Sequence, residues 1–305
     1  MPGRREGCVV LDKPRGITSR ACVDQACRLL GTRKIGHAGS LDPLATGILP
    51  LCVGRATKIV QYLMKVEKEY VAVAHLGQTT ATLDAEGPVV NERPVPPLSL
   101  QDVDACARTF TGLITQMPPA YSAKKVGGQR SYDLARSGKV LVLKPIEVTV
   151  HAIECLRLDL PFMELRIRCS HGTYIRTLCA DMGEQWGCGA HVVSLRRTRQ
   201  GPFSEEDAVT LDAWAAMPHP EARMLSLAEA LSFLPACVLE EDEAVRLCRG
   251  QRVPVNSSTP AGTVRVITPE GRLIGLALAG SSDNLVPLRI FEPNPPTGLA
   301  LEEEA

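Results

Sequence analysis

The chain has 305 residues, of which 45% are hydrophobic, and this length suits one large domain or a large and a small one. No apolar run is long enough to span a bilayer, and the first residues lack the apolar stretch of a signal peptide, so we expect a soluble, cytoplasmic protein without a membrane partner. The eleven cysteines are scattered and form no Cys-x-x-Cys pair, which argues against a disulfide framework.

The formal net charge is zero, yet the charges are unevenly distributed along the chain. Residues 1–68 and 119–200 carry net charges of +7 and +6, whereas residues 69–118 and 201–305 carry −4 and −9. A locally basic face on a neutral protein can bind phosphate groups. The two basic regions are therefore compatible with a nucleic-acid partner, and solvated helix faces are the alternative explanation for part of this charge.

Hydrophobic patterning and end signals predict a strand and two helices in the first part of the chain. Cys8–Leu11 is a short apolar run and reads as a strand. It is followed by a helix that Thr18 or Ser19 is expected to cap and that Gly31 should end. Thr57 is expected to cap a second, short helix.

The middle of the chain predicts further strands and two longer helices. Ser99 and Asp102 form a capping box at the start of one helix. Thr173 is expected to cap another, whose first turn contains Arg176. The helix dipole disfavours a cation there by roughly 0.3–1 kcal/mol, so a nearby carboxylate is the simplest reason for an arginine at this position. Strands are expected over residues 70–76, 146–158, 162–169 and 192–198.

The stretch from Gly36 to Pro50 holds a single carboxylate, Asp42, among small, apolar and turn-forming residues. Pro43 restricts the backbone of Asp42 and fixes its own φ angle, so we expect the pair on a rigid loop. His37 is the only other ionisable residue of the stretch. A lone acid on such a loop suits a nucleophile or a base, and the alternative is a structural turn with a capping aspartate.

One pattern could imitate a zinc site, since Cys169 and His171 are followed by Cys188 and His191 at a metal-like spacing. Cys169, however, continues the inward alternation of the strand expected over residues 162–169. The other cysteine and histidine flank a glycine-containing turn. We therefore expect no bound metal.

Residues 117–145 differ from the rest of the chain. Gly127 and Gly128 allow a flexible turn, and a short helix is expected to end at Gly138. A basic insertion with few buried positions should be mobile until a negatively charged partner orders it. Its basic residues are Lys124, Lys125, Arg130, Arg136, Lys139 and Lys144.

An acidic link over residues 204–234 precedes a C-terminal region with its own strand pattern. A helix over residues 242–249 and strands over 263–268, 273–278 and 285–291 predict a small β-barrel. We therefore expect a first domain over residues 1–235, a second over 236–293, and a disordered tail over 294–305.

The segment around Asp42 reads GHAGSLDPLATGILPLCVGRATK. It resembles the catalytic segment of the TruB family, the enzymes that make pseudouridine in the TΨC arm of tRNA. The resemblance recurs in chain order at VLDKPRGITS, EKEYVAVAHLG, MPPAYSAKKVGGQRSYDLAR, SHGTYIRTLCADMGEQWGCGAHVVSLRRT and a C-terminal segment. A match of this length and order is far more specific than one short motif. It implies an α+β fold with a mixed, mainly antiparallel sheet, flanking helices, a thumb over residues 117–145 and a PUA-like C-terminal barrel.

The resemblance also implies the roles of individual residues. Asp42 would be the essential carboxylate, Arg176 its ion-pair partner, and Tyr70 the ring that stacks on the flipped uracil. Lys13 would support the catalytic loop, and His171 stands where many family members carry lysine. The expected substrate-binding residues are His37, Leu195, Tyr174 and Lys13, with Lys124, Lys125 and Arg130 of the thumb.

The expected activity is the conversion of uridine 55 in the TΨC loop of tRNA to pseudouridine, without a cofactor and by a monomer that needs no obligate protein partner. Two alternatives remain open at this stage. One is the guide-RNA-dependent relative of box H/ACA particles, which would use the same aspartate. The other is a non-enzymatic protein that binds or folds tRNA, against which the intact Asp42 segment, Tyr70 and Arg176 argue.

Overall fold

The structure is a computed structural model that describes residues 6–119, 125–126, 129–130, 143–255, 259–280 and 284–291. The chain divides into two compact units, each described here by itself. The larger unit spans Val9–Met224, and the smaller one combines Glu6–Cys8 with the residues from Leu225 onward. No helix in the described part of the chain is long and apolar enough to cross a membrane.

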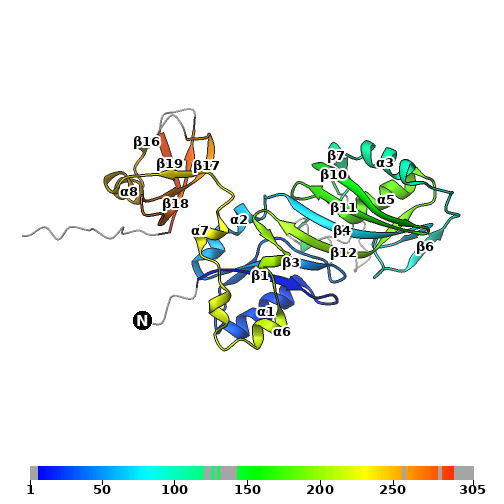
Figure 1. The fold of residues 1–305 in the computed structure, drawn as a ribbon, viewed down its shortest axis with the longest axis horizontal. Coiled ribbons are helices and arrows are strands. Elements are labelled where there is room, and N and C mark those ends of the chain that lie inside the picture. Colours follow the sequence, from blue (N-terminus) through cyan, green and yellow to red (C-terminus); the bar gives the residue numbers. More distant parts are fainter. Residues whose placement is uncertain are drawn as a thin grey trace, which may run out of the picture. The chain divides into compact units, whose positions relative to one another are not determined.

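A mixed, mainly antiparallel sheet of ten strands forms the centre of the larger unit (Figure 1). Two of the ten strands, β2 (Ile35–His37) and β13 (Phe203–Ser204), lie beside the main path and pair with β3 (Thr46–Val53) and β12 (Ala190–Gln200), respectively. This sheet confirms the fold class that the sequence predicts. The main path runs in the order β14 (Val209–Thr210), β1 (Gly7–Lys13), β3 (Thr46–Val53), β12 (Ala190–Gln200), β4 (Lys68–Leu76), β11 (Phe162–Cys169), β10 (Ile146–Asp159) and β7 (Gly112–Gln116).

Strand β12 brings two distant segments together. On one side it pairs with β3 in parallel, and on the other side it pairs with β4 in antiparallel register. Arg197 of β12 thereby lies between Gly47 of β3 and Tyr70 of β4. The loop that carries Asp42 leads directly into β3, so this pairing sets the loop beside Tyr70.

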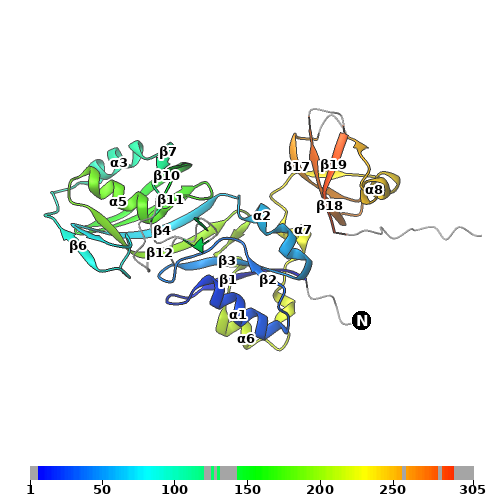
Figure 2. The same ribbon diagram turned by 180° about the vertical axis from the view of Figure 1, so that it is seen from behind.

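Helices cover the sheet at both ends of the larger unit (Figures 1 and 2). Helices α1 and α6 lie at the end formed by β1 and β3, whereas α3 and α5 lie near β10, β11 and β7. In the described part of this unit, the helices are α1 (Ser19–Leu30), α2 (Val60–Leu63), α3 (Leu100–Thr109), α5 (Ile175–Gln185) and α6 (Leu211–Ala215), with 3₁₀ turns at Gly54–Ile59, Glu205–Asp207 and Pro220–Arg223.

The predicted helix ends of α1 and α3 are confirmed. The Thr18 hydroxyl accepts a hydrogen bond from the Ala21 N–H at 3.0 Å, and Gly31 ends the helix with a φ of 62°. Ser99 and Asp102 form the reciprocal bonds of a capping box.

Two expected caps are wrong. The residue before α5 is Tyr174, and no side chain caps this helix, because the Thr173 hydroxyl donates instead to Ser170 O at 3.0 Å. Thr57 lies inside the 3₁₀ turn Gly54–Ile59, and its hydroxyl donates to Gly54 O at 2.8 Å. Both hydroxyls bond a carbonyl three residues back, a local alternative to capping that the residue type alone does not reveal.

The stretch expected as one rigid loop contains two strands. β2 ends at His37 and β3 begins at Thr46, so only the residues between them form the loop. The sequence pattern does not predict β3, because Gly47 and Pro50 are both unfavourable inside strands. Every residue of β3 after Thr46 is buried, so the strand lacks the polar–apolar alternation that marks a half-buried strand.

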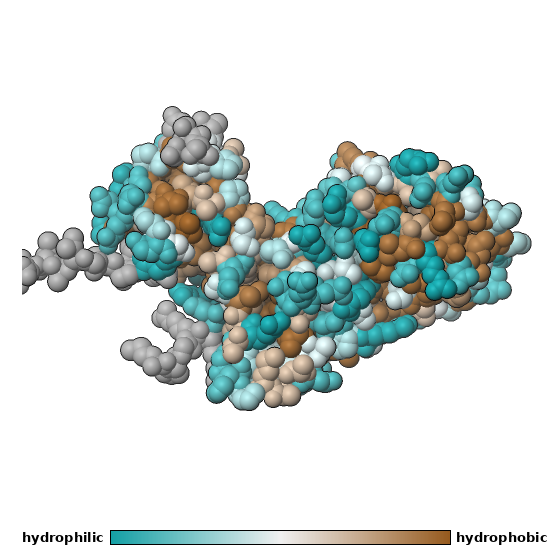
Figure 3. All heavy atoms as spheres, viewed as in Figure 1, coloured by the Kyte–Doolittle hydropathy of each residue, from teal (hydrophilic) through white to brown (hydrophobic). Residues whose placement is uncertain are grey.

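The core of the larger unit lies between the sheet and its helices. The buried face of β4 presents Tyr70, Ala72 and Ala74, as the alternation predicts. Some apolar side chains stay outside the core, and Figure 3 shows them gathered on the part of the larger unit formed by β10, β11 and β4. In the hairpin formed by β10 and β11, the exposed large apolar side chains are those of Leu156, Leu160 and Phe162.

The thumb is described only in part. Lys125–Val126 (β8) and Gln129–Arg130 (β9) form a short antiparallel pair, in which Lys125 lies opposite Arg130. Lys124 and the helix expected to end at Gly138 lie outside the described residues, as does the tail over residues 294–305.

The smaller unit has a curled five-stranded sheet, as expected for a PUA-like barrel. Its apolar core includes Leu247 of α8 and Val264, Ile274 and Leu285 of three successive strands. The elements are α7 (Leu227–Ala230), α8 (Glu241–Cys248) and the strands β15 (Ala236–Val238), β17 (Gly262–Ile267), β18 (Leu273–Ala279), β19 (Asn284–Ile290) and β16 (Val253–Pro254), in sheet order.

The close contact between β3 and β12 gives a stability prediction. Gly47 has a φ of 95°, and a Cβ at this position would lie 2.2 Å from Arg197 O. Gly47→Ala should therefore lower the free energy of unfolding by more than the roughly 1–3 kcal/mol of backbone strain alone. Gly112→Ala is the matched control, because Gly112 has a φ of 102° with no atom within 4 Å of the added Cβ. Equal losses for both variants in chemical denaturation would contradict this reading.

Candidate active site

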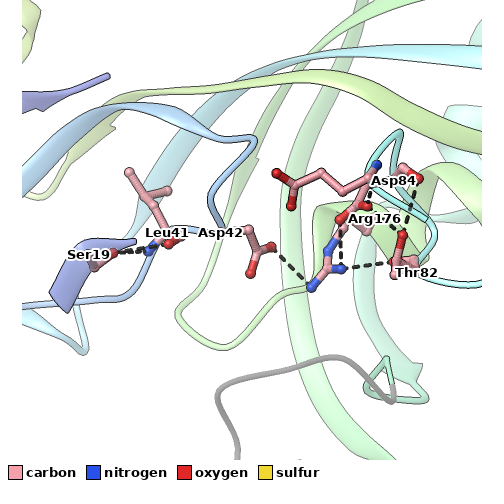
Figure 4. A network of polar contacts seen from close by, with 7 residues as sticks. Ser19, Leu41, Asp42, Thr82, Asp84 and Arg176 are labelled. Carbon is pink, nitrogen blue, oxygen red and sulfur yellow. Dashed lines mark hydrogen bonds and ion pairs between the residues drawn. The ribbon is translucent and has the colours of Figure 1, made fainter. Parts of the chain in front are cut away.

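The loop between β2 and β3 positions Asp42 through its own backbone. The Leu41 N–H donates to Ser19 Oγ at 2.8 Å, and the same hydroxyl donates back to Leu41 O at 3.0 Å (Figure 4). Ser19 is buried at the start of α1. The backbone of Leu41, the residue immediately before Asp42, is therefore fixed to α1, and this restricts the position of the Asp42 side chain.

Lys13 holds the other side of this loop. It is fully buried, and its Nζ donates to Pro43 O at 3.2 Å and to Pro14 O at 2.9 Å. The Gly16 N–H also donates to Pro43 O, at 2.8 Å. Burial lowers the pKa of Lys13, with Asp42 among the acids that oppose the shift. Lys13 is expected both as a support of the catalytic loop and as a substrate-binding residue, and its hydrogen bonds in the structure are those of the support.

Strand β12 supplies two further supports. Arg197 Nη2 donates to Gly39 O at 3.0 Å, and Gln200 Nε2 donates to Ala38 O and, at 2.9 Å, to Leu63 O. Both side chains are buried. The loop is thus bonded along its length by side chains from α1, β1 and β12, mainly through its carbonyl oxygens.

Asp42 shares an arginine with a second carboxylate (Figure 4). Arg176 Nη2 lies 3.0 Å from Asp42 Oδ2, and its Nη1 lies 2.9 Å from Asp84 Oδ2. Arg176 Nη1 also donates to Thr82 O at 2.8 Å. The expected carboxylate near the first turn of α5 is therefore present, and there are two of them.

Exposure distinguishes the two acids. The side chain of Asp84 is 3% exposed and that of Arg176 is 6% exposed, whereas 39% of the Asp42 side chain is exposed. A substrate can therefore reach Asp42 but not Asp84. The buried Arg176–Asp84 pair therefore supports the accessible carboxylate of Asp42 from inside the protein.

Asp84 was missed in the sequence. It lies in the loop between β5 (Gln78–Thr80) and β6 (Val89–Glu92), a hairpin that the patterning did not predict. The Thr82 hydroxyl donates to Asp84 Oδ1 at 2.5 Å, and the Glu86 N–H donates to the same oxygen at 3.1 Å. Such a local pattern is typical of an ordinary aspartate turn. The only related signal was Arg176 in the first turn of α5, which called for a nearby carboxylate but did not identify Asp84.

Neighbouring groups shift the pKa of Asp42 in opposite directions. Removal from water raises the pKa of Asp42, the Arg176 guanidinium opposes this increase, and the charge of Asp84 adds to it. The pKa of the neighbouring Glu86 is also raised, first by burial and then by Asp84. Arg176 is thus the main group that keeps Asp42 ionised.

Asp42 opens into a cavity of about 590 Å³, within the usual size range of ligand pockets. Of the expected site residues, Tyr70, Leu195, Tyr174, Arg176 and Asp42 line it. His37 ends β2 and does not line it, and Lys13 lies beneath the loop. Lys125 and Arg130 are placed only by their strand pairing. Sequence reasoning missed the lining residues Gln61, Met64, Lys65, Lys68 and Arg197.

Tyr70 is buried in the wall of this cavity. Burial raises the pKa of its hydroxyl, and a hydrogen bond and the positive charge of Arg197 oppose the increase. Its neighbours on the same face of β4 are alanines, which leaves space beside the ring.

The cysteines and histidines of the possible zinc pattern have other surroundings. Cys169 is buried in β11, and burial raises its pKa to about 11. The Cys188 thiol donates to Gly183 O at 3.6 Å, and His191 Nδ1 lies 3.1 Å from Gln78 O. Within the described ranges, no three histidine, cysteine, aspartate or glutamate side chains are grouped to hold a metal ion.

Three family descriptions match successive parts of the chain. Residues 27–175 match the N-terminal domain of the TruB family pseudouridylate synthases. Residues 176–245 match the C-terminal domain of tRNA pseudouridylate synthase B, and residues 235–291 match the C-terminal region of pseudouridine synthase II TruB.

Individual relatives and solved structures agree with these matches. The chain is 44% identical to tRNA pseudouridine synthase B of Pseudomonas fluorescens over 93% of this chain and 95% of that protein. It is 45% identical to the protein of that name from Xylella fastidiosa, over 94% and 96%. A crystal structure of a Cbf5-Nop10-Gar1 complex superposes with a TM-score of 0.75 at 27% identity, covering 94% of this chain and 85% of that one. With this fold, this cavity and these relatives, the chain belongs to the TruB family of pseudouridine synthases.

Proposed function

We propose that the protein converts the uridine at position 55 in the TΨC loop of tRNA to pseudouridine, with Asp42 as the essential carboxylate. Family membership and relatives named tRNA pseudouridine synthase B support an enzyme that isomerises uridine in tRNA. The observation that carries the role of Asp42 is its placement: an accessible carboxylate, 3.0 Å from a buried guanidinium, at the wall of a cavity.

The reaction breaks the N1–C1′ bond of uridine, rotates the base and joins C5 to C1′. The target base must first leave its stack, which costs a few kcal/mol and is offset by contacts in the pocket. An ionised carboxylate can then either attack the nucleoside or remove a proton from the sugar. Arg176 serves both routes, because it keeps the charge on Asp42 and fixes the direction of the oxygens.

The other site residues complete the proposal. Tyr70 stacks on the flipped uracil and takes part in proton removal from C5, while Leu195 and Tyr174 form neighbouring walls. His37 occupies the space that the base leaves in the RNA. Lys124, Lys125 and Arg130 of the thumb contact the phosphates.

The enzyme acts on tRNA as a monomer, without a guide RNA or an obligate protein partner. Identity favours this choice, since relatives named for tRNA are 42–45% identical and the Cbf5 structure is 27% identical to this chain. The test is to mix the purified protein with an unmodified tRNA transcript alone and follow hydrogen release from uridine C5. A wild-type protein that releases none would contradict the proposed function, and a transcript lacking uridine 55 is the control for position.

Asp42→Asn tests whether the carboxylate reacts or only shapes a turn. Asparagine keeps the size and most hydrogen bonds, so a structural role predicts retained activity. We expect conversion to vanish while tRNA binding stays within about tenfold, or about 1.4 kcal/mol. Asp24→Asn, which makes the same change at an exposed ion pair, should leave conversion intact. Appreciable single-turnover conversion by folded Asp42→Asn would overturn the assignment.

The pKa of Asp42 predicts the acid side of the pH–rate profile. Only the ionised form acts, so the single-turnover rate should fall as the pH decreases through this pKa. Because burial raises the pKa, the fall should occur above the ordinary value of about 3.9. Arg176→Met removes the opposing cation and should move the fall of its residual activity to still higher pH. An unchanged acid limb in Arg176→Met would show that the ion pair does not control Asp42.

Reversing the charge of the thumb tests its role in RNA binding. Replacing Lys124, Lys125 and Arg130 together by glutamate should raise the apparent Kd for tRNA and flatten its dependence on salt. Each lost phosphate contact removes roughly 0.7–0.9 from the slope of log K against log salt concentration. A slope equal to that of the wild type would assign these residues to a solvated face.

A further inference from the structure

Arg197 is a buried cation without a matching acid. Its side chain is only 1% exposed, and within the described residues no aspartate or glutamate oxygen forms an ion pair with it. An unpaired charge is costly to remove from water, so such groups are kept only where other interactions require them. Arg176, the other buried arginine of the cavity, has two carboxylate partners.

Carbonyl oxygens and one hydroxyl surround Arg197. Its Nε donates to Ile48 O at 2.6 Å, and its Nη2 donates to Gly39 O at 3.0 Å. Its side chain is also hydrogen bonded to the hydroxyl of Tyr70, the residue opposite it on the neighbouring strand. The guanidinium is therefore fixed between the catalytic loop and the tyrosine that lines the same cavity.

The charge of the cavity lining has a clear sign. Among the described residues that line it, Asp42 is the only acid, whereas Lys65, Lys68, Arg176 and Arg197 are basic. Lys68 is also buried, with Nζ bonded to two carbonyl oxygens, and burial followed by the charge of Arg197 lowers its pKa to about 8. Because Asp42 is already paired, this surplus favours a negative charge inside the cavity.

We propose that Arg197 is a positioning residue for the last proton transfer, in which it holds the Tyr70 oxygen and stabilises its anionic form. This inference rests on the proposed function. After C5 has joined C1′, the Tyr70 oxygen takes the proton from C5. The electron pair of the C5–H bond forms the C5=C6 double bond, the electron pair of the C6=N1 double bond moves onto N1, and N1 takes a proton from water. Tyr70 then returns its proton to solvent, so the step changes no net charge.

The groups around Tyr70 explain why Arg197 carries this role. Cys169 faces it from β11, Asp42 from the catalytic loop, and Arg197 from β12. Burial, Cys169 and Asp42 all oppose the phenolate and raise the pKa of Tyr70. Arg197 is the group that opposes them, by both its charge and its hydrogen bond. Lys68 lies two residues away on the same strand.

Two substitutions separate charge from shape. Arg197→Gln keeps an amide donor for Gly39 O but removes the charge, and Arg197→Lys keeps a charge that can be titrated. The ionisation of Tyr70 is measured by tyrosine absorbance, with Tyr70→Phe subtracted, and the single-turnover rate is measured against pH. Arg199→Met, at an exposed arginine of the same strand, is the control.

In Arg197→Gln, we expect Tyr70 to ionise about one pH unit or more above the wild type, with at least a tenfold slower rate at pH 8 and tRNA binding within about threefold. In Arg197→Lys, the rate should decline at alkaline pH where the introduced amine loses its proton. The wild type should show no such decline at that pH, because arginine stays protonated. Arg199→Met should match the wild type.

Unchanged Tyr70 ionisation in Arg197→Gln would overturn the inference. Should that variant not fold, Arg197→Lys decides alone, and an alkaline limb equal to that of the wild type would overturn it. A wild-type protein that makes no pseudouridine would instead contradict the proposed function. Conversion by the wild type with identical profiles in both variants would contradict only the role of Arg197.

Discussion

The site depends on one buried guanidinium that two carboxylates share. If Arg176 had only Asp42 as a partner, a single accessible acid would have to neutralise the arginine and also react. Asp84 removes this conflict, because it is buried and bonds Arg176 at 2.9 Å on the other side. Asp42 is then oriented by the arginine but is not needed to compensate all of its charge. Asp84 is itself fixed by Thr82 and by the backbone at Glu86, so the support extends into the β5–β6 hairpin.

The sheet topology makes the rest of the site a consequence of strand pairing. β12 lies between β3 and β4, and it is the only strand of the main path that contacts both the segment after the Asp42 loop and the strand of Tyr70. The inward side chains Leu195 and Arg197 of β12 therefore line the same cavity, between the Asp42 loop and the strand of Tyr70. Two buried polar groups on one strand would normally weaken a core. Here Arg197 and Gln200 each donate one hydrogen bond to the catalytic loop, and a second one to Ile48 O of β3 and to Leu63 O of α2, respectively.

The sequence predicted the fold class and long strands such as β4, β10, β11 and β12. The resemblance to the TruB family predicted the contact between Asp42 and Arg176. The helix dipole alone gave a coarser expectation, because an arginine in the first turn of a helix calls for a nearby carboxylate without saying which one. Asp84 could not be found in this way, since its hydrogen bonds to Thr82 and Glu86 resemble those of any turn. β3 was missed because Gly47 and Pro50 contradict strand patterning, and their tolerance comes from pairing partners far along the chain. Buried Arg197 looked like another basic residue of a charged segment until its burial was known.

The hydrogen bonds to the catalytic loop end mainly on main-chain atoms. Ser19, Lys13, Arg197 and Gln200 recognise the backbone of residues 38–43, and none of these bonds uses a loop side chain. The side chains that place Asp42 therefore lie outside the loop, at positions up to 162 residues away in the chain. Loop side chains that line the cavity, such as Ser40, can therefore be substituted to alter the pocket while the reactive carboxylate keeps its position. Changes at the distant supports would instead displace it without touching the loop.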